Sequence, residues 1–257
     1  MKTALGFWFR LSVCILFLFS VSPARAEQDE TEMEFSIGVG GAVGTSLYKG
    51  YGTQWTPLPL LSFENSWVYV RGLSVGLKVI NLDFLEVSVF AGYDPTSFKA
   101  KDSTDQRMRR LDNRSSSALA GLEARLLTPY GMLLVRGAGD ILSQSDGLTG
   151  EVGYKHSLEL GPLEFIPSAG LYWANSNYNG YYYGVSGRES RKSGLDSYTP
   201  GTSFSPYIGL GVDWEIDEQW DVFCQGEVVF PANEIKDSPM VNKSNSKNLS
   251  FGIVYSF

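Results

Sequence analysis

The chain holds a single histidine, His156, which is followed directly by Ser157. A serine hydrolase needs a histidine base within hydrogen-bond reach of its nucleophile and a third group that orients the base. Adjacent residues of a β-strand point to opposite faces, so Ser157 is a poor partner if this segment is a strand. A histidine at a membrane interface is the favoured interpretation, and an outer-membrane hydrolase that uses His156 is a minor alternative. We therefore predict that the protein is not an enzyme.

The residue types give little support for acid–base catalysis by paired carboxylates or for metal binding. Asp213 and Glu215 would share one face of a strand, and paired carboxylates can perform general acid–base catalysis. Charges that line a polar lumen give the same pattern, and we favour that interpretation. Metal sites need clustered ligands, but outside the first 26 residues the chain has one histidine and one cysteine, Cys224. We expect no catalytic, cofactor-binding or metal-binding residues, and we expect Cys224 to face lipid.

Two segments could bind ligands outside the cell. The aromatic side chains Tyr178, Tyr181, Tyr182 and Tyr183 could form a stacking platform for carbohydrate. We favour instead that they belong to an aromatic girdle or pack a long loop onto the rim of a barrel. The segment 101–114, "KDSTDQRMRRLDNR", has mixed charge with a basic centre. It could contact anionic lipopolysaccharide or could simply be a solvated loop.

The elements that must carry these residues are β-strands, because a period of two recurs along the chain. In "FSPYIGLGVDW", residues 204–214, apolar side chains alternate with small or polar ones, and residues 117–126, 148–158 and 163–173 follow the same pattern. Each run has about the 9–11 residues that a tilted strand needs to cross a bilayer. Soluble sandwiches typically have strands of about five or six residues. The pattern therefore predicts an all-β transmembrane barrel.

The polar faces of these strands are rich in glycine and carry charges of both signs. A narrow polar lumen collects such residues. We expect the following side chains to face the lumen: Glu86, Glu123, Arg125, Glu151, Lys155, Asp213 and Glu227.

Connection lengths give the strand count. Short polar turns are predicted at 64–66, 81–83, 128–129, 161–162 and 217–219, and long loops at 48–54, 94–114, 141–147, 176–203 and 232–247. Outer-membrane barrels alternate short periplasmic turns with long external loops. A further turn near Arg71 and Gly72 gives twelve antiparallel strands with both termini in the periplasm; ten strands with an irregular insert is the alternative. The final "NLSFGIVYSF" is expected to close the barrel against the first strand, since an open edge in lipid leaves backbone groups unpaired.

The first 26 residues have the layout of a secretory signal peptide. A positive start precedes the apolar run "LSVCILFLFSV", and "ARA" at 24–26 offers small residues at a cleavage site. Its removal leaves residues 27–257 as a single barrel domain, with 18 basic residues against 28 acidic ones and a net charge of −10. This balance argues against nucleic acid as a partner. We expect a location in the outer membrane of a Gram-negative cell.

Several stretches together resemble the MipA/OmpV family of outer-membrane proteins. They are "YKGYG" at 48–52, "GYDP" at 92–95, "SDGLTGEVGY" at 145–154, "LYWANSNYNGYYYGVSGRES" at 171–190, "DSPMV" at 237–241 and the closing "FGIVYSF". Their order and spacing cover essentially the whole chain after the signal peptide. The resemblance implies an outer-membrane barrel. It also implies a scaffold that links a murein-cleaving transglycosylase with a murein synthase, whereas other members are known as surface antigens.

We therefore expect a non-enzymatic outer-membrane barrel that organises murein-processing enzymes, with outer-membrane lipid and lipopolysaccharide as further partners. The acidic residues 27–34 offer the only extended periplasmic segment, because the predicted turns are short. A small-solute channel and a surface-exposed adhesin or antigen are the alternatives.

Overall fold

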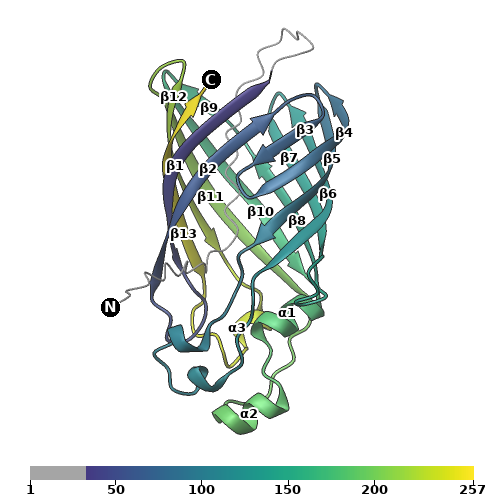
Figure 1. Cartoon of the computed structure of the whole chain (residues 1–257), viewed down its shortest axis with the longest axis vertical. Helices are drawn as coiled ribbons and strands as arrows, with labels where there is room; N and C mark the ends of the chain where they lie inside the picture. Colours follow the sequence, from purple (N-terminus) through teal and green to yellow (C-terminus); the bar gives the residue numbers. More distant parts are fainter. Residues whose placement is uncertain (1–32) are drawn as a thin grey trace, which may run out of the picture.

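A computed structural model describes residues 33–257, so the predicted signal peptide and the acidic residues 27–32 lie outside the described residues. The described chain forms one antiparallel sheet that closes on itself (Figure 1). Its strands are β1 (Glu34–Thr45), β2 (Thr53–Glu64), β3 (Val68–Arg71), β4 (Ser74–Leu82), β5 (Leu85–Asp94), β6 (Ser117–Thr128), β7 (Gly131–Asp140), β8 (Leu148–Lys155), β9 (Leu158–Leu160), β10 (Leu163–Ala174), β11 (Ser203–Glu215), β12 (Trp220–Val229) and β13 (Ser246–Ser256).

The barrel has twelve strands, because β8 and β9 are two parts of one. Both pair with β10 in a single register, in which Lys155 lies opposite Ser168 and Leu158 opposite Phe165. The ladder is interrupted between them where His156 donates its N–H to the carbonyl of Pro167 at 3.1 Å. Pro167 has no N–H, so it cannot donate the second hydrogen bond of this pair to the carbonyl of His156. The prediction of twelve strands is confirmed, and the ten-strand alternative is wrong.

The predicted turn near Arg71 is also confirmed. β3 ends at Arg71 and β4 begins at Ser74, and between them Gly72 adopts φ = 59°, a conformation that favours glycine. The resulting β3–β4 hairpin is short. β2 pairs with β3 only through Ser62–Glu64, whereas it pairs with β1 along its whole length.

The closing strand lies where its sequence predicts. β13 pairs with β1 in antiparallel register from Ser36 opposite Ser256 to Gly44 opposite Asn248. The N–H of Phe257 extends this pairing by donating to the carbonyl of Phe35 at 3.0 Å. The last strand therefore hydrogen-bonds to the first and completes the ring.

The five predicted short turns lie at one end of the barrel and the long loops at the other, as predicted (Figure 1). The additional β3–β4 turn lies between the two ends, beside Leu61 of β2. β1 begins and β13 ends at the short-turn end; that this end faces the periplasm stays a prediction. The long loops carry five short helices: η1 (Ala100–Asp102), η2 (Met108–Arg110), α1 (Ser176–Tyr183), α2 (Gly187–Ser193) and α3 (Asn233–Lys236). Among residues 33–257, none of the helices is long and apolar enough to cross a membrane.

The outer surface of the barrel is apolar. Exposed aliphatic side chains recur at alternate positions of the strands, for example Ile37 and Val39 in β1 and Ile208 and Leu210 in β11. Exposed aromatic side chains flank them near both ends: Trp67, Phe84, Tyr130 and Phe257 at the short-turn end, and Trp55, Phe204 and Phe230 near the loops. An apolar band between two aromatic girdles is typical of a barrel in a bilayer. Cys224 is exposed on this surface.

Candidate functional site

An ionic network occupies the barrel interior near the short-turn end. Arg71, at the end of β3, lies between two carboxylates: its guanidinium donates to Glu64 at 2.5 and 2.9 Å and to Glu86 at 2.9 and 3.0 Å. Lys78 of β4 lies 2.6 Å from Glu64 and 3.5 Å from Glu86. Both cationic side chains are buried, and buried charges are tolerated only when they are paired and hydrogen-bonded.

Glu123 of β6 joins this network to the next strand. The residue is 1% exposed, and its carboxylate accepts hydrogen bonds from Arg125 at 2.7 Å and from Arg136 of β7. Arg71 lies 3.8 Å from the same carboxylate. Side chains from β2 to β7 are thereby linked across the inner face of the barrel.

A second polar group lies on the wall from β8 to β12. Tyr207 of β11 donates to Glu151 at 2.8 Å, and Tyr172 of β10 donates to Glu227 at 3.1 Å. The two tyrosine rings stack with their centroids 4.5 Å apart. Register places Glu151 directly opposite Arg136, so this group adjoins the ionic network.

None of the seven predicted lumen charges is exposed. Five are buried, namely Glu86, Glu123, Arg125, Glu151 and Glu227, and two are half-buried, namely Lys155 and Asp213. The structure adds four charged partners to the seven predicted ones: Glu64, Arg71, Lys78 and Arg136. Arg136 had a detectable signal, because it is the one charge within the strand "GMLLVRGAGD" before its terminal aspartate.

The interior is not uniformly polar. Tyr69, Phe90, Leu119 and Ala138 form a buried apolar cluster on the inner faces of β3, β5, β6 and β7. The guanidinium of Arg136 lies over the ring of Phe90 at 4.3 Å, and that of Arg71 lies over Tyr69 at 4.0 Å. Cations and rings therefore pack against each other, and the interior combines charged with apolar side chains.

The long loops pack together into a cap with its own apolar core. Tyr48, Tyr51, Phe98, Ala100, Met108, Leu111, Val185, Leu195 and Met240 are buried in it and come from four different loops. Arg114 holds the cap from inside by donating to the carbonyls of Tyr181 and Gly184 and to Glu189 at 2.7 Å. Burial raises the pKa of the Glu189 carboxyl, but hydrogen bonds from Arg114 and Ser186 outweigh it and hold that pKa below its usual value.

The four predicted outer-loop aromatics belong to this cap. Tyr182 is fully buried and donates to the carbonyl of Ser115 at 3.1 Å. At the rim, the hydroxyl of Tyr178 lies within hydrogen-bond distance of Asp94, at 2.9 Å, and of Thr96, at 3.0 Å. Tyr181 and Tyr183 are half-buried. This geometry agrees with loop packing, the interpretation favoured from sequence, rather than with an exposed platform for carbohydrate.

His156 has no catalytic neighbours among the described residues. Its Nδ1 lies 2.6 Å from the carbonyl oxygen of Tyr130, whereas Ser157 donates to Glu164. Residues 33–257 contain no cluster of three or more His, Cys, Asp or Glu side chains suited to a metal.

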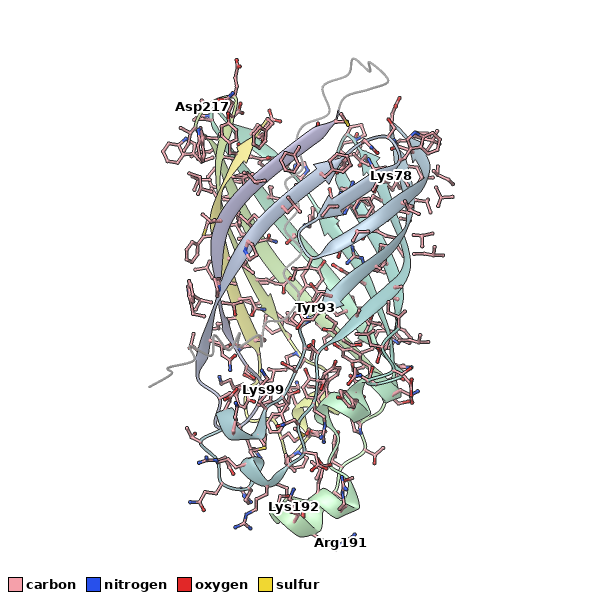
Figure 2. The ribbon with its side chains drawn as sticks, in the orientation of Figure 1. Lys78, Tyr93, Lys99, Arg191, Lys192 and Asp217 are labelled. Carbon is pink, nitrogen blue, oxygen red and sulfur yellow. The ribbon has the colours of Figure 1, made fainter. Side chains whose placement is uncertain are left out.

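The two ends of the barrel differ in charge. Near the short-turn end, Glu164 lies opposite both Glu159 and Asp213, and Glu215 lies opposite Asp221. Like charges in directly opposite positions destabilise a sheet. The cap instead exposes basic residues: Arg107, Arg109, Arg110, Arg188, Arg191 and Lys192. Figure 2 shows Asp217 at one end of the molecule and Arg191 and Lys192 at the other.

Comparison with known proteins identifies the family. A family model described as MltA-interacting protein MipA matches residues 37–257, which is nearly the whole described chain. This chain belongs to the MipA family. It is 39% identical over 223 residues to the MltA-interacting protein of Escherichia coli strain K12, with 87% of this chain and 90% of that protein covered. It is also 26% identical over 179 residues to the outer membrane protein OmpV of Vibrio cholerae, with 70% of this chain and 66% of that protein covered.

The predicted resemblance to MipA and OmpV is thus confirmed. A closed barrel with an apolar belt, together with relatives named as outer membrane proteins, makes this MipA-family chain an outer-membrane β-barrel protein.

Proposed function

We propose that this MipA-family barrel is a non-enzymatic scaffold that binds a murein-cleaving transglycosylase at its short-turn end and brings it to a murein synthase. The main support is the similarity to a relative named MltA-interacting protein, which extends over 87% of the chain. A scaffold needs a stable surface rather than a reaction centre. Among the described residues, His156 lacks the partners of a catalytic base.

The packed interior favours a scaffold over a channel. Arg71 and Glu123 are almost fully buried in the ionic network, so bulk water does not surround them. At the other end, Phe98, Met108 and Met240 are fully buried in the cap core. Twelve strands can enclose a lumen that side chains fill. We therefore expect no stable open pore.

The short-turn end is the surface that we assign to the enzyme partner. Its turns are short, but the turn from β11 to β12 exposes Asp217 and Glu218 beside the opposed pair Glu215 and Asp221. Repulsion among these carboxylates costs stability in the isolated barrel. A basic surface on the partner would relieve that repulsion and gain electrostatic complementarity.

The proposal can be tested by measuring how the purified full-length barrel in detergent binds a soluble MltA-type transglycosylase. We expect Asp217→Lys with Glu218→Lys to weaken binding and to reduce its dependence on salt. Arg109→Glu with Arg110→Glu, a charge reversal of the same size in the cap, is the matched control and should leave binding unchanged. Equal binding by all three proteins would refute the assigned surface, and no binding of a transglycosylase by the unmodified barrel would refute the scaffold.

A further inference from the structure

The barrel wall has an interruption between β2 and β5. Thr53–Leu60 of β2 pair with β1 on one edge, but no strand of residues 33–257 pairs with their other edge. The tip of the β3–β4 hairpin lies at the top of this interruption: Gly72 donates to the carbonyl of Leu61 at 3.1 Å, and Tyr93 of β5 donates to the carbonyl of Leu73 at 3.0 Å. β5 ends at Asp94, one residue after this contact, so Thr53–Leu60 of β2 continue with no described strand at that edge (Figure 1).

Loop contacts bound the interruption at its other end. Thr104 donates its N–H to the carbonyl of Gly50 at 3.0 Å, and the hydroxyl of Tyr51 lies 2.7 Å from the backbone of Lys99. The interruption is therefore a window with four sides: the edge of β2, the hairpin tip, the chain after β5 and the base of the cap. In Figure 2, Tyr93 marks the β5 side of the window and Lys99 marks its end at the base of the cap.

Two prolines make the free edge of β2 unsuited to another strand. The carbonyl of Leu61 accepts from the N–H of Gly72, and the N–H of Asn65 donates to the carbonyl of Val68. The backbone N–H and C=O groups of the odd-numbered residues in this segment therefore point toward the β3 side, away from β1. This alternation assigns Pro57 and Pro59 to the free edge. Neither has an N–H, and proline within sheets occurs where the missing donor faces an unpaired edge. The free edge thus offers carbonyl acceptors but few donors.

The side chains beside the window suit an apolar ligand that enters from the membrane. On the outer face, Trp55, Pro57, Pro59 and Leu61 are exposed in the apolar belt. On the inner face, Leu58 and Leu60 are half-buried and lie between the polar residues Thr56 and Ser62, of which Thr56 is fully buried. Apolar side chains therefore lie on both faces of β2 along its free edge.

The loop that borders the window carries positive charge. After β5 the chain runs through η1 and η2, where Arg107, Arg109 and Arg110 are exposed. Arginine is well suited to bind phosphate. We propose that the window binds lipopolysaccharide, with one acyl chain in the opening against Leu58 and Leu60 and the lipid phosphates at these arginines. Hydroxyl and amide groups of the lipid would supply donors to the free carbonyls of β2.

Site-specific photocrosslinking in Gram-negative cells tests this assignment. A benzophenone amino acid is placed at Leu58, at the exposed Leu61 and at Leu134, a buried inner-face leucine of β7 where the wall is continuous. We expect a lipopolysaccharide adduct at Leu58 and Leu61 and none at Leu134. Arg107→Gln with Arg109→Gln and Arg110→Gln should remove the Leu58 adduct and leave the barrel heat-modifiable on gels.

Other outcomes would overturn the proposal. An adduct at Leu61 but none at Leu58 would mean that lipid meets only the outer face and that the window is closed to it. A protein adduct at Leu58 would mean that the free edge binds a polypeptide instead. Absence of adducts at both positions would remove lipopolysaccharide as the ligand. Each variant is first checked for heat-modifiable migration, and Leu60 serves as the second inner-face position if the Leu58 variant does not fold.

Discussion

Replacing Glu123 by glutamine should destabilise the barrel strongly. The substitution keeps the shape of the side chain but removes the negative charge that Arg125 and Arg136 share. Glu123 is 1% exposed, so water cannot replace it, and two guanidinium groups would lose their nearest carboxylate. Another carboxylate, that of Glu86, lies farther from Arg125, at 4.0 Å. Removing one partner of a buried ion pair typically costs about 3–5 kcal/mol, and we expect the free energy of unfolding to fall by that amount.

The assay is urea unfolding in phospholipid vesicles, followed by tryptophan fluorescence and by migration on gels without boiling. Asp112→Asn provides the control, because it removes the exposed ion pair between Asp112 and Arg188, whose side chain is 78% exposed. Surface pairs contribute about 0–1 kcal/mol. A loss for Glu123→Gln no larger than that of this control would refute the view that the interior network is desolvated. Added salt should weaken the contribution of Asp112 and leave that of Glu123 nearly unchanged.

Three further predictions follow from the fold and the cap. Leu58→Pro should lower the free energy of unfolding by several kcal/mol, because it removes an N–H that bonds to β1. Pro57→Ala at the free edge should change the free energy of unfolding by less than about 1 kcal/mol. Equal effects of the two substitutions in urea titration would contradict the assigned edge. Since the pKa of Glu189 is lowered in the folded protein, the stability that its charge adds is complete above the ordinary value of 4.5 and is lost as the pH falls through the folded pKa. The difference in Tm between the unmodified protein and Glu189→Gln should therefore shrink on acidification, and a constant difference would exclude the Arg114–Glu189 pair as its source. In planar bilayers the purified barrel should give no stable conductance, and repeated stepwise currents would support the channel alternative.

The strands could be predicted from sequence because their signals are local. Alternating side chains and turn residues specify where each strand begins and ends, and the glycine at 72 marks a turn inside an apolar segment. The break between β8 and β9 was not predicted, although its cause, Pro167, is visible in the sequence. The position of the break depends on which residue lies opposite Pro167. That register is set by how the two strands pair, so neither strand's sequence gives it alone.

The interior network and the cap were harder to predict. Glu64 and Arg71 lie beside turns, where charged residues are expected to be solvated, yet the strand register brings them together 2.5 Å apart inside the barrel. In β7 both faces are apolar around Arg136, so the period of two gives no clear inner face there. The cap has no periodicity at all, since its core combines single side chains from separate loops, such as Phe98, Met108 and Met240.

The pairing of β1 with β13 has a consequence for how the molecule assembles. These strands are more than 200 positions apart along the chain, so the contact that seals the cylinder is also among the most distant in sequence. Contacts of this kind form slowly, because closing a long loop costs conformational entropy before the contact can stabilise the fold. Until β13 has been added, one edge of β1 therefore stays unpaired. An unpaired strand edge can pair with another polypeptide, so assembly requires that this edge is protected until the barrel closes.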